Sequence, residues 1–274
     1  MCYSFSGMKV LVYINSDKEN RGEYCSCLKS LLVKHGLDFD FIFGDEVPKE
    51  KDYSAIVVLG GDGTILHRTE FANLSEIPII GINCGKLGFL SEFEMSEAED
   101  AIVMLKNGEL ALDERLTLKI SFNGKTYYAL NDIAVSRIYE DNKRLIVNLD
   151  VKVGDKPLSE VSGDGIIVAT PTGSTAYSLS AGGAVLEPHI NAFCTTPVAA
   201  HSFLSRAVVC SAENVLTLTH KGGAKAGLFA DGKLIGYLNE GDGVVVSKAE
   251  KKTLFLRKKD FDFFARLNSK MQSV

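Results

Sequence analysis

The sequence predicts a two-domain protein: an N-terminal α/β domain on a parallel sheet and a C-terminal domain that is mainly antiparallel β. Two observations predict this class. The first hundred residues alternate apolar runs with helically spaced segments, and after about residue 110 short strand candidates follow one another. The length of 274 residues, 46% of them hydrophobic, suffices for two ordinary domains. We expect one domain over residues 1–110, with 256–274 returning to it, and a second over 111–255.

The N-terminal part reads as alternating strands and helices. Lys9–Ile14, Phe39–Phe43, Ala55–Leu59 and Ile77–Ile82 are strand candidates, and Tyr24–His35 has the leucine spacing of a helix. The strands are continuously apolar rather than alternating. Strands of this kind are typical of parallel sheets that are covered on both faces.

The C-terminal part reads as a sandwich or a pair of packed sheets. Asn123-Gly124 and Asp231-Gly232 are turn signals between strand candidates. One helix is expected within this part, near Ser174–Leu186, and another after it, over Asp260–Asn268. The strand candidates are Leu116–Phe122, Thr126–Leu130, Ile133–Ser136, Leu145–Val153, Gly165–Thr170, Ala207–Cys210, Val215–Thr219, Gly227–Ala230 and Val244–Lys248.

Composition excludes several broad classes of function. The formal net charge is −5, without the basic excess of a general nucleic-acid or membrane-surface binder. No apolar run reaches the roughly 18 residues of a membrane span, and the N-terminus lacks the pattern of a secretory signal. The six cysteines do not have zinc-site spacing, so we expect reduced cysteines in a cytoplasmic protein.

The strongest motif is Gly60-Gly61-Asp62-Gly63-Thr64, directly after an apolar strand candidate. Ligands of open α/β sheets bind beyond the carboxyl ends of strands, where glycines let the backbone approach a phosphate. A carboxylate among phosphates is repulsive unless it binds Mg²⁺ or accepts a proton from an attacking hydroxyl. Asp62 is therefore a base or metal-ligand candidate; the structural alternative is a tight turn with Asp62 as a helix N-cap.

A second motif spans Ser162 to Gly183 and holds seven serine and threonine hydroxyls and five glycines in 22 residues. Hydroxyls donate and accept without charge, which suits ribose, adenine and phosphate edges. The alternative is a loop in which Ser174 or Thr175 caps a helix. Asp164 and the density of glycines exceed what a cap requires.

Two smaller features are also candidates. Asn131-Asp132 lies between two apolar runs, where it is either a turn or an amide and a carboxylate that grip a ribose diol. His67 lies one turn past the glycine loop, within reach of a phosphate. No GxSxG elbow and no Walker-type GxxxxGK[ST] motif is present.

Together these motifs resemble the NAD kinase family. The similarity spans nearly the whole chain in the family's order, and TPTGSTAYSLSAGG at 170–183 is its most specific part. The other matching segments are GGDGT at 60–64, GINCGKLGFLSE at 81–92, Asn131-Asp132, HSFLSRAVV at 201–209 and Asp231-Gly232. GGDG alone also marks diacylglycerol-type lipid kinases and phosphofructokinases.

The resemblance implies phosphorylation of the adenosine-ribose 2′-hydroxyl of NAD by ATP with a divalent metal, Mg²⁺, giving NADP. It also implies a homodimer or homotetramer. On the family pattern Asp62 accepts the proton, Gly63 lies against NAD, and Asn131 and Asp132 hold the adenosine ribose. The remaining candidate binding residues are His67, Arg144, Ser162, Asp164, Thr172, Thr175, Ala176, Tyr177, Ser178, Leu179, Ser180 and Lys233.

This chain departs from the family pattern at one of these positions. Asp132 stands where many members carry glutamate, which shortens the reach but keeps the charge. Two alternative functions stay open at this point: a lipid or sugar kinase that shares the GGDG core, and a non-catalytic NAD(P)-binding sensor.

Overall fold

The structure is a computed structural model that describes residues 8–14, 21–44, 46, 48, 52–85, 87–139, 146–201 and 205–272. The chain forms two compact units. The first comprises the residues up to Glu114 together with those from Thr253 onward, and the second comprises Arg115–Lys252. Among the described residues, no helix is long and apolar enough to cross a membrane.

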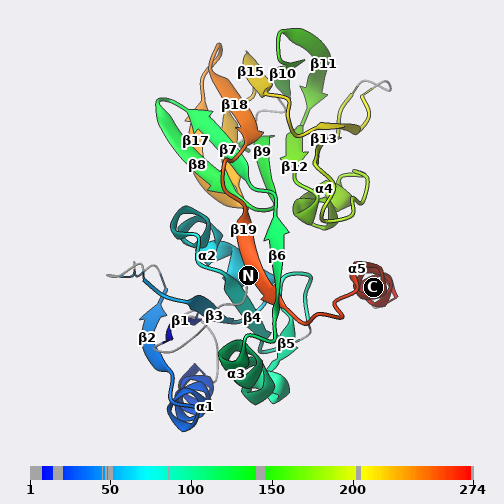
Figure 1. The fold of residues 1–274 in the computed structure, drawn as a ribbon. Helices are drawn as coiled ribbons and strands as arrows, with labels where there is room; N and C mark the ends of the chain where they lie inside the picture. Colours follow the sequence, from blue (N-terminus) through cyan, green and yellow to red (C-terminus); the bar gives the residue numbers. More distant parts are fainter. Residues whose placement is uncertain are drawn as a thin grey trace. The chain divides into compact units, whose positions relative to one another are not determined.

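The first unit is built on a sheet in which the strand order is β2-β1-β3-β4-β19-β6, with β5 paired to β4 (Figure 1). The β1–β2, β1–β3, β3–β4 and β4–β19 pairs are parallel, so the predicted parallel α/β arrangement is confirmed. The strands are β1 (Lys9–Ile14), β2 (Asp38–Phe43), β3 (Ala55–Leu59), β4 (Ile79–Asn83), β5 (Phe93–Glu94), β6 (Ala111–Arg115) and β19 (Thr253–Arg257).

Burial explains why the central strands of this sheet are continuously apolar. Every residue of β3 and β4 is buried, and β1 is buried from its second residue onward. Strands covered on both faces have no solvent side on which polar residues would be favoured. The core formed by these strands also takes in Leu28 and Leu32, which lie on α1 (Arg21–Lys34).

Three further helices belong to this unit. They are α2 (Asp62–Ser75), α3 (Ala98–Asn107) and α5 (Phe263–Met271). Helix α3 was not predicted, although its sequence carries a helical signal. Its residues Ala98, Ala101, Ile102 and Leu105 are buried at helical spacing, and Gly108 ends it with a φ of 66°. A 3₁₀ turn, η1 (Met95–Glu97), leads into α3.

The second unit contains two six-stranded sheets in which every strand pair is antiparallel, as predicted. One has the order β11-β10-β15-β18-β7-β8 and the other β14-β13-β12-β9-β16-β17. Apolar residues of both sheets share one core. The strands are β7 (Leu118–Phe122), β8 (Lys125–Ala129), β9 (Asp132–Arg137), β10 (Val147–Val153), β11 (Lys156–Gly163), β12 (Gly165–Ala169), β13 (Ala192–Val198), β14 (Val208–Ser211), β15 (Leu216–Gly223), β16 (Ala226–Ala230), β17 (Lys233–Leu238) and β18 (Gly243–Lys248).

Three strands of this unit were not predicted. β11 and β17 are edge strands with many exposed or half-buried residues, so they lack an apolar run. β13 contains Pro197, which counts against a strand in a single sequence. Its first five residues are buried nevertheless, because β13 lies between β12 and β14.

The helix predicted near Ser174–Leu186 is much shorter than expected. The segment forms a 3₁₀ turn, η2 (Thr172–Thr175), and a single helical turn, α4 (Tyr177–Ser180). Neither has a side-chain cap, so the capping role proposed for Ser174 or Thr175 is wrong. The Ser174 hydroxyl instead donates to the carbonyl of Pro171 at 2.6 Å and accepts from the N–H of Leu186 at 2.9 Å. These bonds fold the segment back on itself, and a longer helix would break them.

Candidate functional site

The glycine loop joins the buried strand β3 to helix α2 in the first unit. Gly61 is the N-cap of α2, and Asp62 is its first residue. Asp62 is therefore not the N-cap, and the structural alternative considered for it is wrong. The position at the start of the helix favours a carboxylate, because the N–H groups of the first turn carry partial positive charge.

The Asp62 carboxylate accepts three backbone hydrogen bonds from the loop that follows β4. The N–H of Phe89 donates to Oδ2 at 2.7 Å, while those of Leu90 and Ser91 donate to Oδ1 at 3.1 and 3.4 Å. Each carboxylate oxygen has about two lone-pair positions. Oδ2, with one donor among the described residues, therefore keeps a position at which it can accept a further proton or hydrogen bond.

The glycines of the motif serve two different purposes. At Gly60, φ is 152° and an added Cβ would lie under 3.0 Å from the side chain of Thr64, so glycine is required by the fold itself. At Gly61 and Gly63, no atom of the described residues lies within 4 Å of an added Cβ. Nothing within the described part of the chain requires glycine there, which leaves room for an approaching ligand.

Two basic residues lie one turn further along α2, His67 and Arg68, and their environments differ. His67 is exposed. Arg68 is 6% exposed, stacks on the ring of Tyr13 at 3.9 Å, and donates to the carbonyl oxygens of Gly44 and Glu46. Arg68 thus connects α2 to Tyr13, Gly44 and Glu46 inside the unit, whereas the side chain of His67 lies at the surface, where a ligand can reach it.

Two arginines from the end of the chain hold the loop that binds Asp62. Arg257 of β19 donates from Nη2 to the carbonyl of Phe89 at 3.0 Å, and Arg266 of α5 donates from Nη1 to the carbonyl of Gly88 at 2.9 Å. Arg257 also pairs with Glu92 and Asp113, at 3.0 and 2.6 Å. Neither arginine could be predicted as part of the site, since no motif spacing connects them with residues that lie so much earlier in the chain.

The second unit has a pocket of about 450 Å³ beside the Asn131-Asp132 pair. Four of the predicted binding residues line it: Asn131, Asp132, Ala176 and Tyr177. Asn131-Asp132 does not form a turn on its own, because Asp132 is already the first residue of β9. The other lining residues are Ala134, Ser136, Phe229, Asp231 and Gly232.

Asp231 fixes the backbone of this pair. Its carboxylate accepts from the N–H groups of Leu130, Asn131 and Asp132 at 2.8, 2.7 and 3.1 Å, and its own N–H donates to the Asp132 carbonyl at 2.9 Å. Gly173 of the TPTGS motif packs against the same backbone, since an added Cβ would lie under 3.0 Å from the Asn131 carbonyl. Sequence-distant motifs thus converge on Asn131.

Asp132 has an unusual acidity. Burial, and to a smaller extent the negative charge of Asp231, together raise the pKa of its carboxyl group to about 7. A carboxyl group with a pKa near neutrality in a pocket is a common property of functional sites.

The remaining predicted residues of the hydroxyl-rich segment lie outside the lining of this pocket. Thr172 and Ser178 are buried and bonded within the unit, to Arg115 at 3.3 Å and to Thr196 at 2.9 Å. The hydroxyl of Thr175 donates to the Thr172 carbonyl at 3.1 Å. Leu179 is 38% exposed, and Ser180 is exposed beside it.

Three further predicted residues flank these elements. Ser162 donates to the Asn148 side chain at 2.8 Å, and Asp164 forms an ion pair with Arg137 at 3.0 Å. Lys233 is exposed at the start of β17. Arg144 lies outside the described residues.

Comparison with known proteins decides the family. The sequence model of the ATP-NAD kinase N-terminal domain matches residues 32–110, and that of the C-terminal domain matches residues 130–258. An NAD kinase from Caldicellulosiruptor bescii is 31% identical over 265 residues, which cover 97% of this chain and 100% of that protein. The chain belongs to the NAD kinase family. An NAD kinase from Prosthecochloris aestuarii is 34% identical over 281 residues, or 96% of each chain.

A solved structure shows the same fold. The crystal structure of yeast NADH kinase complexed with NADH superposes with a TM-score of 0.85 at 23% identity, over 97% of this chain and 87% of that one. This confirms the predicted NAD kinase-like fold. The two family models and the curated relatives confirm the predicted kinase activity on NAD. Membership of the NAD kinase family also separates this chain from the lipid and sugar kinases that share GGDG.

Proposed function

We propose that the chain transfers the γ-phosphoryl group of ATP to the 2′-hydroxyl of the adenosine ribose of NAD, giving NADP and ADP. The observation that carries this proposal is the setting of Asp62. It lies beyond the carboxyl end of a parallel strand and between two glycines, and within the described part of the chain these glycines have open space beside them and Oδ2 keeps an accepting position.

In the proposed reaction the 2′-oxygen attacks the γ-phosphorus while the bond to the β,γ-bridging oxygen breaks, and ADP leaves. The proton of the 2′-hydroxyl passes to Oδ2 of Asp62. A positioned base typically contributes about 10²–10⁴ in rate. Gly61 and Gly63 let phosphate oxygens approach the N–H groups at the start of α2.

We assign NAD binding mainly to the pocket at Asn131 and Asp132. The Asn131 amide oxygen and the Asp132 carboxylate are acceptors for the two hydroxyls of the nicotinamide-side or adenosine-side ribose, of which the family resemblance favours the adenosine ribose. Tyr177, a residue that is 44% exposed, supplies an aromatic ring to the lining of the pocket. The other proposed contacts are Gly63, His67, Arg144, Ser162, Asp164, Thr172, Thr175, Ala176, Ser178, Leu179, Ser180 and Lys233.

The proposal includes Mg²⁺. The described residues hold no group of three or more histidine, cysteine, aspartate or glutamate side chains suited to a metal. Mg²⁺ usually keeps several waters and is held by one or two carboxylates plus substrate phosphates. The donor set fits such an ion, carried by the triphosphate, with Asp62 as the carboxylate of this chain at the glycine loop. When bound, the ion neutralises charge on the phosphates.

We further propose that the predicted domains bind different substrates. Residues 1–110 and 256–274 bind ATP, and residues 111–255 bind NAD.

We also propose that the protein is a cytoplasmic homodimer or homotetramer. The described cysteines, Cys25, Cys27, Cys84, Cys194 and Cys210, are free thiols, which supports a reducing compartment. Light scattering on the purified protein measures the size of the oligomer.

The experiment that tests the function incubates purified protein with ATP, Mg²⁺ and NAD and follows NADP. Asp62→Asn keeps the size of the side chain but removes the base, so we expect kcat to fall by about 10²-fold or more with NAD binding largely preserved. Glu70→Gln removes an exposed carboxylate of the same helix and is the matched control. Near-full turnover of Asp62→Asn would remove Asp62 from the base role. Binding of NAD by the unmodified chain without turnover would favour a sensor.

A further inference from the structure

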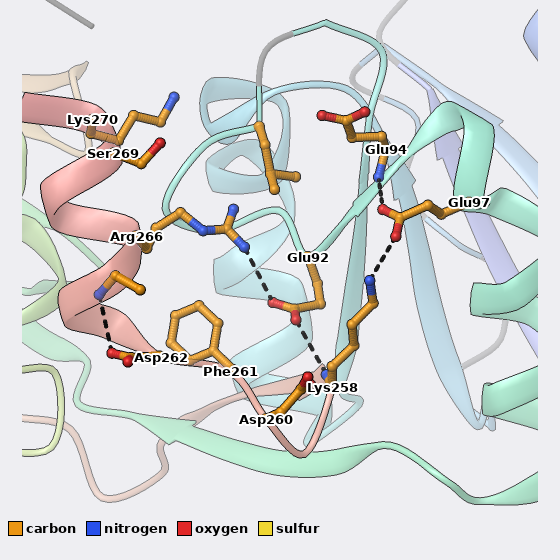
Figure 2. Close-up of a pocket in the computed structure, with 12 residues that line it drawn as sticks. Glu92, Glu94, Glu97, Lys258, Asp260, Phe261, Asp262, Arg266, Ser269 and Lys270 are labelled. Carbon is orange, nitrogen blue, oxygen red and sulfur yellow. Dashed lines mark hydrogen bonds and ion pairs between the residues drawn. The ribbon is translucent and has the colours of Figure 1, made fainter. Parts of the chain in front are cut away.

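Helix α5 contacts the loop that holds Asp62 through Phe263, whose ring centroid lies 6.4 Å from that of Phe89, and through the hydrogen bonds of Arg266. The guanidinium of Arg266 donates from Nη1 to the carbonyl of Gly88 at 2.9 Å and to that of Ser91 at 3.4 Å. Its Nη2 lies 4.0 Å from a carboxylate oxygen of Glu92, and Figure 2 shows the side chain reaching from the helix toward that residue. The Arg266 side chain is only 15% exposed.

The bond from Arg266 acts on the same peptide group that binds Asp62. The Gly88 carbonyl and the Phe89 N–H belong to one planar peptide unit. Arg266 donates to its oxygen at 2.9 Å, while its N–H donates to Oδ2 of Asp62 at 2.7 Å. A charged donor on the carbonyl fixes the orientation of the plane and polarises the N–H toward the carboxylate.

A second peptide group repeats this arrangement for the other carboxylate oxygen. Arg257 donates to the Phe89 carbonyl at 3.0 Å, and the adjoining Leu90 N–H donates to Oδ1 of Asp62 at 3.1 Å. Arg257 is 2% exposed and also pairs with Glu92 and Asp113. Because those pairs are buried, replacing Arg257 would disturb the whole unit. Arg266 is therefore the arginine whose effect on Asp62 can be isolated.

The surroundings of α5 allow Arg266 to be replaced without disturbing the rest of the unit. A cavity of about 800 Å³ lies between α5 and the segment that includes Glu92, Glu94 and Glu97, with Lys258 on its wall (Figure 2). No residue of α5 is fully buried. Loss of the Arg266 side chain would thus remove specific hydrogen bonds without opening the apolar core.

We propose that Arg266 is a positioning residue for Asp62, acting through the Gly88–Phe89 peptide to hold Oδ2 where it receives the proton of the attacking hydroxyl. This rests on the proposed base role of Asp62. The last helix of the chain therefore takes part in catalysis without touching either substrate. Phosphoryl transfer depends on exact placement, and a displacement of about 1 Å can cost about 10²-fold in rate.

The test measures kcat and the KM for NAD in Arg266→Met, Arg266→Lys and two controls. We expect Arg266→Met to lower kcat by about 10- to 100-fold with the KM for NAD within about twofold of the original. Arg266→Lys, which keeps one donor for the Gly88 carbonyl, should recover part of that loss. Ser269→Ala lines the same cavity from the next turn of α5, and Lys258→Met removes a cation from its far wall; both should keep kcat.

A double-mutant cycle separates positioning from a general structural role. A residue that acts only through Asp62 has nothing left to position in Asp62→Asn, so adding Arg266→Met should leave the residual turnover unchanged. Labelled ATP makes that residual turnover measurable. Unchanged kcat in Arg266→Met, or losses that multiply in the double variant, would overturn the positioning role. If Arg266→Met does not fold, Arg266→Lys carries the same cycle.

The two proposals fail in different ways. High activity of Asp62→Asn would end the base role, whatever Arg266 does. An inactive Asp62→Asn together with a fully active Arg266→Met would leave the base role intact and end the positioning role alone.

Discussion

The α-carbon of Gly88 lies against the carboxylate of Asp62. A β-carbon added at residue 88 would stand under 3.0 Å from both carboxylate oxygens of Asp62, closer than real β-carbons come to other atoms. The φ of Gly88 lies outside the left-handed region, so the glycine is needed for close approach rather than for backbone freedom. Gly88, the last residue of the GINCGKLG segment, thus leaves the space that the Asp62 carboxylate of the GGDGT loop occupies.

We predict that Gly88→Ala lowers kcat by about 10-fold or more, because Asp62 has to rotate away from its three N–H donors. Steady-state production of NADP checks this. Gly22→Ala is the control, since an added Cβ on α1 meets none of the described atoms within 4 Å. Normal kcat in Gly88→Ala would show that the bonds to Asp62 are dispensable.

We predict that Asp231→Ala weakens NAD binding more than it slows the chemical step. The substitution removes the acceptor for three backbone N–H groups and places alanine at a φ of 45°, so the Asn131-Asp132 backbone loses its support. We expect the Kd for NAD, measured by calorimetry, to rise about 10-fold, equivalent to roughly 1.4 kcal/mol.

A carboxylate elsewhere in the same unit is the control for Asp231. Asp242 accepts from the Asn239 N–H at 2.7 Å in an exposed turn, so Asp242→Asn perturbs a similar bond. Equal effects of the two substitutions on NAD binding would refute a specific role for Asp231.

We predict that the free energy of unfolding falls between about pH 4 and pH 7 because of Asp132. The fold raises the pKa of its carboxyl group from the ordinary 3.8 to about 7, so the folded state binds the extra proton and loses this advantage as the pH rises through 7. About three pKa units correspond to roughly 4 kcal/mol as an upper bound.

Asp132→Asn has no charge to develop at this position. Its free energy of unfolding, from urea titrations, should therefore lose less than that of the original protein between pH 4 and pH 8. Parallel pH profiles of the two proteins would contradict a raised pKa of Asp132.

We predict that His220→Leu stabilises the second unit. His220 is 4% exposed, and neither ring nitrogen has a hydrogen-bond partner among the described residues. Leaving such polar atoms buried costs about 1–3 kcal/mol, part of which leucine should recover. Thermal unfolding measures the gain, with His189→Leu at an exposed position as the control. A lower Tm in His220→Leu would indicate that the ring packs better than leucine.

Much of the fold could be predicted from the sequence because local chemistry dictates it. The continuously apolar Ala55–Leu59 is buried on both faces, and the alternation of strands and helices matches the parallel sheet. Prediction failed where tertiary contacts override local preference. The serine-rich segment after Thr172 forms only a single helical turn because Ser174 and Ser178 bond to Leu186 and Thr196.

The sequence by itself determined the family and the loop that carries Asp62, because both reside in contiguous motifs such as GGDGT and TPTGSTAYSLSAGG. Only the tertiary structure decided what holds Asp62 and Asp132. Their partners, the Phe89–Ser91 amides with Arg266 behind them and Asp231, lie 27 to 178 residues from the groups they bind. Hydrogen bonds act over about 3 Å in space whatever the separation along the chain, so no local pattern records them.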